Sequence, residues 1–206
     1  NITSAFIGGI IFNFANLLLV IAIEIAGMAI AFPIGIGIAL VLGVFTNYIA
    51  QPEGDPLILI VGVILVAIAI LIDGIAYKKI LQKTNENPLK GILFSVSAGI
   101  AMGFFYKYVA ASMATDFIIP EAGKLTPYSA LVIFSLGIII SSFLFNTINM
   151  YRPFSGEKVS FSDYFTMGNT KLHLIGILGG VIWGIGMSFN IIASDQAGPA
   201  IAYGLG

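Results

Sequence analysis

The sequence predicts an all-α, polytopic transmembrane helix bundle. Hydrophobic residues make up 58% of the 206-residue chain and charged residues only 9%, whereas a soluble domain carries about 25% charged residues. The apolar segments are long enough to cross a bilayer as helices, which takes about 20 residues each. Apolar and polar residues do not alternate with period two, so the strands of a membrane barrel are not expected. The 24 glycines favour close helix packing in a membrane. A water-soluble fold is therefore excluded.

Six apolar segments with few or no charged residues predict six membrane-spanning helices. Loops rich in proline, glycine, asparagine and acids at 51–56 and 83–88 mark two of the connections. Because the chain begins and ends without clear loop signals, we expect it to be part of a longer protein. The predicted spans are 5–23, 28–49, 57–77, 90–112, 128–150 and 172–194, and a seventh begins near Pro199.

Most of the nine basic residues fall in the loops of one face of this bundle. Basic residues that flank spans are retained on the cytoplasmic side, so we expect an integral protein of the plasma (inner) membrane with these loops in the cytoplasm. The net charge of −1 offers no basic surface for nucleic acid. The basic loop residues are Lys78, Lys79, Lys83, Lys90, Arg152, Lys158 and Lys171, while Lys124 lies on the other face.

Two segments of the sequence match at a constant offset of 171 positions. Residues 8–35 align without gaps on residues 179–206, with paired glycines and an acid at the same place, Glu24 in one copy and Asp195 in the other. The two copies begin on predicted spans that are five crossings apart, so they must point in opposite directions across the membrane. The sequence thus predicts an inverted repeat.

Inverted repeats are common in secondary transporters, in which two halves move about a site near the membrane midplane. We expect a 5+5 inverted repeat of ten helices, about seven of which are covered, the last one truncated. The first repeat occupies residues 1–83, helices 3 to 5 of the full bundle. The second occupies residues 84–206, helices 6 to 8 and the start of helix 9.

Polar side chains near the middle of the first span predict part of a substrate site. Asn13 and Asn16 are three residues apart and lie on one helix face. Polar groups in hydrocarbon are costly unless they face the bundle interior or a water-filled cavity. Their amides therefore suit a ureide or a sugar, although an interhelical hydrogen bond without a substrate role is the alternative.

The second copy of the repeat carries a matching stripe. Trp183, Met187 and Asn190 follow one another on a single helix face. Phe12 and Asn16 occupy the positions equivalent to Trp183 and Met187, so two symmetric stripes predict a shared cavity. Simple packing also explains an aromatic residue and a methionine on one face.

Charged side chains supply further candidates. Lys107, next to Tyr106 in an aromatic run, suits an anionic group or a coupling role, although a lysine near a span end more often reaches the interface. Glu24 and Asp195 are candidates for gating or proton coupling. The alternative is that each carboxylate stabilises the N-terminus of the helix that follows it.

Several strings resemble those of a known group of transporters. They are GIIFNFAN at 9–16, AFPIGIGIAL at 31–40, LTPY at 125–128, GVIWGIGM at 180–187 and AGPAIAYGLG at 197–206. In these strings the chain resembles the ureide permeases and the glucose and ribose porters (sugar transporters) of the drug/metabolite transporter, or EamA-like, superfamily. The resemblance implies ten helices and proton-linked uptake of polar solutes such as allantoin, uracil or sugars. The short 78–90 connection lacks a nucleotide-binding string, so ATP is not expected.

Together these patterns predict a secondary active transporter that moves a small polar metabolite, either a ureide or nucleobase or a sugar, by alternating access. We expect it to be a symporter driven by a proton or cation gradient. An exporter of amphipathic compounds with the same architecture is the first alternative. An integral membrane enzyme is the second, but it needs paired acids or a His/Asp/Glu cluster. The acids are scattered singly and there is one histidine. No catalytic residue, cofactor or metal ligand is predicted.

Overall fold

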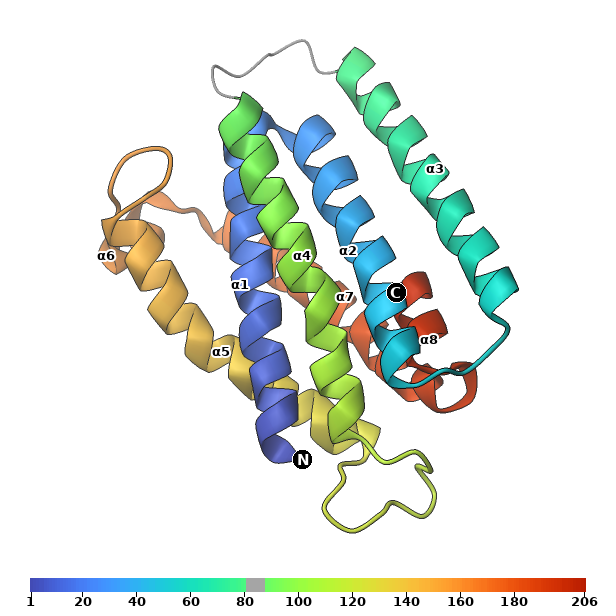
Figure 1. Cartoon of the computed structure of the whole chain (residues 1–206). Coiled ribbons are helices and arrows are strands. Elements are labelled where there is room, and N and C mark those ends of the chain that lie inside the picture. The colour runs from blue at the N-terminus through green and yellow to red at the C-terminus, as the bar shows by residue number, and fades with distance from the viewer. Residues whose placement is uncertain (81–87) are drawn as a thin grey trace.

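The computed structural model describes residues 1–80 and 88–206, and it is a bundle of helices (Figure 1). Six helices are long and apolar enough to cross a membrane, so the six predicted spans are confirmed to within a few residues at their ends. The predicted repeat boundary at 83/84 and the basic residue Lys83 lie outside the described residues. The helices are α1 (Ile2–Ala26), α2 (Met28–Ala50), α3 (Pro56–Ile80), α4 (Pro88–Ser112), α5 (Pro127–Tyr151), α6 (Phe161–Met167), α7 (Thr170–Ala197) and α8 (Pro199–Leu205).

Helix α1 lies at the centre of the bundle and packs along its length against α4 (Figure 1). The two helices are antiparallel, since Ser4 Oγ near the start of α1 donates to Tyr108 O near the end of α4 at 2.7 Å. Helices α2 and α5 flank this pair, and α3 packs mainly on α2 at the periphery. Helix α1, which carries both polar and apolar side chains, is therefore packed between α4 and α5.

Glycines bring the central helices into close contact. A Cβ added to Gly9 of α1 would overlap the carbonyl of Phe134 in α5, and one added to Gly99 of α4 would overlap the carbonyl of Gly35 in α2. The row formed by Gly35, Ala39 and Gly43 is thus a packing surface, as its small-residue spacing predicts. The similar row on α7 differs: added Cβ atoms there meet no described atom within 4 Å. That row is Gly176, Gly180 and Gly184.

The two copies of the repeated segment have the same local structure. Gly27 joins α1 to α2 with φ 82° and ψ 158°, and Gly198 joins α7 to α8 with φ 77° and ψ 153°. Each glycine N–H bonds to the carbonyl four residues earlier, at Ile23 and Ser194. Essentially only glycine adopts this backbone region. Helices α1 and α7 also run in opposite directions through the bundle (Figure 1), while the ten-helix arrangement stays a prediction.

The two ends of the bundle differ in charge. We call one end the basic end, after Lys90, Arg152, Lys158 and Lys171, and the other the acidic end, after Glu53, Asp55, Asp116, Glu121 and Asp195. At the basic end a hydrogen bond joins the start of α4 to the loop that follows α5, because Lys90 Nζ donates to Phe154 O at 2.7 Å. The charge separation follows the distribution that the sequence predicts for two membrane faces.

The short helix α6 at the basic end is absent from the predicted elements. Seven residues are too few to show a helical period, but a capping box marks its start. The backbone N–H and the hydroxyl of Ser160 donate to Asp163 at 2.7 Å and 2.8 Å. These bonds lower the pKa of the Asp163 carboxyl below its usual value. The Ser-x-x-Asp spacing is the sequence signal that could have located the helix.

Candidate functional site

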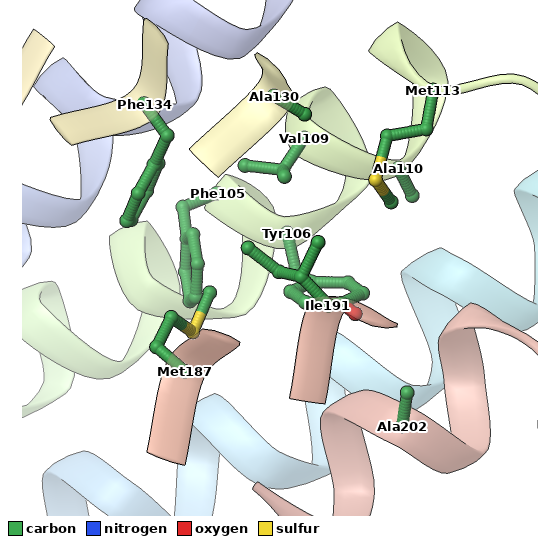
Figure 2. Close-up of a cluster of buried hydrophobic side chains, with 10 residues drawn as sticks. All are labelled: Phe105, Tyr106, Val109, Ala110, Met113, Ala130, Phe134, Met187, Ile191 and Ala202. Carbon is green, nitrogen blue, oxygen red and sulfur yellow. The ribbon is translucent and has the colours of Figure 1, made fainter. Parts of the chain in front are cut away.

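Aromatic rings from four helices meet at the centre of the bundle. The Phe12 ring of α1 stacks on Trp183 of α7 with centroids 4.8 Å apart and planes 21° apart. The Phe105 ring of α4 meets Phe12 edge-on at 5.0 Å. Phe134 of α5 lies beside Phe105, at 5.8 Å (Figure 2). The structure therefore joins the two predicted stripes directly, through the repeat-equivalent pair Phe12 and Trp183.

Two further predicted residues belong to this aromatic cluster. Met187 of α7 reaches toward Phe105, and Tyr106 lies against Ile191 (Figure 2). The exposed fractions are 9% for Met187 and 1% for Tyr106, whereas Trp183 is 43% exposed. The indole is thus anchored on Phe12 while much of its surface stays accessible.

Asn13 is buried and its amide is satisfied by α5. Its Nδ2 donates to Ser141 Oγ at 2.8 Å, and Ser142 Oγ lies 3.3 Å from its Oδ1 and 2.7 Å from Ile138 O, donating to one of them. Asn16 lies on the exposed side of α1. The two amides predicted to share one face therefore have different environments. Asn13 makes an interhelical hydrogen bond, which is the alternative to a substrate role.

The Asn13 network predicts a modest stability effect. Ser141→Ala removes the acceptor of the Asn13 amide, and interhelical hydrogen bonds in membranes average about 0.6 kcal/mol with a maximum near 1.7. We expect the thermal midpoint in detergent to fall by a few degrees. Ser135→Ala on the same helix is the control, since no side-chain hydrogen bond of Ser135 is involved. Equal midpoints for both variants would show that the Asn13 bonds contribute nothing.

Asn190 of α7 lies next to the aromatic cluster, close to Tyr106 and α8. Its Nδ2 donates to Ala202 O in α8, and the Tyr106 hydroxyl is 3.5 Å from its backbone oxygen. The Oδ1 atom of Asn190 is buried and has no hydrogen-bond partner among the described residues. An unpaired buried acceptor costs about 1–3 kcal/mol, so this position favours a ligand that donates a hydrogen bond.

Two residues at the contact between α2 and α8, Tyr203 and Asn47, are not among the predicted site residues. Tyr203 of α8 covers Gly43 of α2, and its hydroxyl lies 3.0 Å from Ala39 O and 3.2 Å from Met102 O, donating to one of them. Asn47, one turn after Gly43, is 1% exposed. The signal for Asn47 is its place on the small-residue row of α2, at four-residue spacing from Gly43.

The predicted charged residues are dispersed. Lys107 is exposed on α4 and lies away from the α1 and α2 contacts of that helix. Glu24 is at the basic end, where its carboxylate faces Gly156. Asp195 is at the acidic end and lines a small cavity of about 20 Å³ together with Glu53. Glu24 and Asp195 thus lie near opposite ends of the bundle, as the inverted repeat predicts for equivalent positions.

One family of known proteins matches this sequence. The family described as sugar transport protein matches residues 1–206. No curated protein and no solved structure matches the chain. The family match extends over all the elements that build the aromatic cluster and the amides around it.

Proposed function

Because the chain belongs to the sugar transport protein family, we propose that it moves a sugar across the membrane by alternating access. The contact that carries this proposal is the stack of Phe12 on Trp183 at 4.8 Å, which joins the two copies of the repeat at the centre of the bundle. The apolar face of a sugar ring packs on an accessible indole, and nearby amides serve its hydroxyls. A few polar groups in an aromatic site set ligand orientation.

Alternating access draws support from the two glycine turns. Gly27 and Gly198 hold the same unusual backbone conformation at repeat-equivalent positions, so each half carries a helix pair joined at a single glycine. Two such pairs pointing in opposite directions suit a rocking movement about a central site. The ten-helix bundle of five plus five is part of this proposal.

Proton coupling is proposed through the acids of the repeat. Glu24 and Asp195 occupy equivalent positions near opposite ends of the bundle, where each is accessible from one side. Protonation of either carboxylate from its own side would favour one of the two access states, and this would link sugar movement to a proton gradient. The basic end is proposed to face the cytoplasm of the plasma (inner) membrane, following the bias of lysine and arginine.

The proposal is tested with the full-length protein in liposomes. Glucose, rhamnose, allantoin and uracil are supplied with and without an inward proton gradient, and accumulation is measured. We expect accumulation of a sugar that the proton gradient increases. Accumulation of allantoin or uracil without any sugar would assign a ureide or nucleobase transporter instead. No accumulation of any of the four would contradict uptake, and efflux from loaded liposomes would then test the exporter alternative.

Substitutions of Trp183 test whether the indole contributes to sugar affinity. Trp183→Ala removes the ring on which the sugar is proposed to pack. With a contribution similar to that of an aromatic pair, about 0.5–1.5 kcal/mol, apparent sugar affinity should fall about two- to tenfold. Trp183→Phe keeps a flat ring and should retain most of the affinity. Phe189→Ala is the matched control, because Phe189 is on the same helix and 69% exposed. An unchanged affinity for Trp183→Ala would remove the indole from the site.

A further inference from the structure

The side-chain amides of Asn47 and Asn190 each donate a hydrogen bond through the nitrogen and accept none from the described residues through the oxygen. The Asn47 Nδ2 donates to Gly43 O at 2.7 Å within α2, and the Asn190 Nδ2 donates to Ala202 O of α8. In both residues Oδ1 is buried and has no hydrogen-bond partner within residues 1–80 and 88–206. Two buried amides therefore each offer an unused acceptor.

The orientation of both amides is determined by their partners. A backbone carbonyl can only accept, so the side-chain nitrogen must face it, and a turned amide would place two oxygens together. The unpaired atoms are therefore carbonyl oxygens. Hydrocarbon supplies no water to pair with them, so a ligand that pairs with them must donate a hydrogen bond.

Contacts connect both amides to Tyr203. Gly43, which accepts from Asn47, lies directly under the Tyr203 ring. Ala202, which accepts from Asn190, precedes Tyr203 in α8. The Tyr106 ring packs against Tyr203 at 5.7 Å. The Asn190 amide thus bonds to α8 directly, whereas Asn47 lies one turn after the glycine of α2 on which Tyr203 packs.

A small cavity lies one turn farther toward the acidic end. Gln51, which follows Asn47 by four residues on α2, lines it together with Ser194 of α7 and Pro199 of α8. Along α2, Asn47 therefore lies between this cavity and the Tyr203 contact.

We propose that Asn47 is a substrate-binding residue, and that its Oδ1, together with Oδ1 of Asn190, accepts hydrogen bonds from hydroxyl groups of a neutral sugar at the α2–α8 contact. This inference rests on the proposed sugar transport. The protein groups at this site are then hydrogen-bond acceptors, which suit a neutral polyol and disfavour a phosphorylated sugar. It also makes hydroxyl groups the basis of specificity, since a site that is built to bond a hydroxyl rejects an analogue that lacks it.

The test is Asn47→Leu in the full-length protein, assayed in liposomes with the transported sugar and its series of monodeoxy analogues. We expect the variant to bind the sugar about tenfold more weakly, with an unchanged affinity for the one analogue that lacks the hydroxyl facing Asn47. The thermal midpoint should be equal to wild type or higher, because the substitution removes an unpaired buried oxygen.

Asn149→Leu is the matched control, since Asn149 of α5 also has a buried Oδ1 without a partner but lies near the basic end. Its sugar affinity should equal that of wild type. Wild-type affinity in Asn47→Leu would overturn the inference. So would an equal loss for the sugar and every deoxy analogue, because that result indicates a structural role. If wild type carries allantoin or uracil and no sugar, the proposed function itself fails.

Discussion

Replacement of Gly9 with alanine is expected to destabilise the bundle more than any other single methyl addition on α1. The new Cβ would overlap the backbone carbonyl of Phe134, which cannot rotate away as a side chain can. Helices α1 and α5 must therefore move apart, and such overpacking costs about 1–3 kcal/mol. The thermal midpoint in detergent should fall by about 2–4 °C for each kcal/mol.

Gly62→Ala is the control for that experiment. No atom lies within 4 Å of the Cβ position at Gly62 in α3, and alanine is a better helix former by about 0.8–1.0 kcal/mol. The midpoint of this variant should stay equal or rise. If both variants lose the same stability, the loss comes from helix backbone properties and the α1–α5 crossing is looser than described.

Replacement of Gly198 with alanine is expected to lower both stability and sugar uptake. The backbone at φ 77° and ψ 153° belongs to a region that costs a residue with a side chain about 1–3 kcal/mol. The new Cβ would also lie 2.7 Å from Glu53 Oε2. Relief of this strain moves α8, and with it Tyr203, away from Gly43. We expect at least a tenfold loss of uptake rate.

A double variant separates the two causes. Glu53→Gly in the Gly198→Ala background removes both Glu53 Oε2 and Glu53 Cβ, which would lie 2.7 Å and 2.9 Å from the new methyl group, but leaves the backbone strain, so it should restore only part of the stability. Gly27→Ala, at the repeat-equivalent turn, should lose a similar amount, whereas Gly37→Ala in α2 should be tolerated because its nearest neighbour would be 3.8 Å away. Normal uptake by Gly198→Ala would show that this turn does not position α8.

Most of the membrane-spanning helices were predictable because their signal is local. A long uncharged apolar run such as 28–49 must be helical in hydrocarbon whatever its neighbours are. Pro199 begins α8 as predicted, since proline favours the first helical position. Helix α6 was missed because a seven-residue amphipathic segment at the membrane surface lacks this signal.

The site was predictable only in part. The repeat offset paired Phe12 with Trp183, and the structure places these two rings in contact. The same pattern could not show that Asn13 bonds to Ser141, because that bond joins residues 128 positions apart. Asn47 and Tyr203 were missed for the same reason, since neither stands out until α8 packs on α2.

The sequence by itself determined that this protein is a bundle of membrane-spanning helices with unequal charge at its two ends and a repeated segment, because apolar length, charge position and self-similarity are properties of the chain. Only the tertiary structure decided which polar groups are paired. Pairing depends on which helix faces meet, and on that basis Asn13 is satisfied while the oxygens of Asn47 and Asn190 are not.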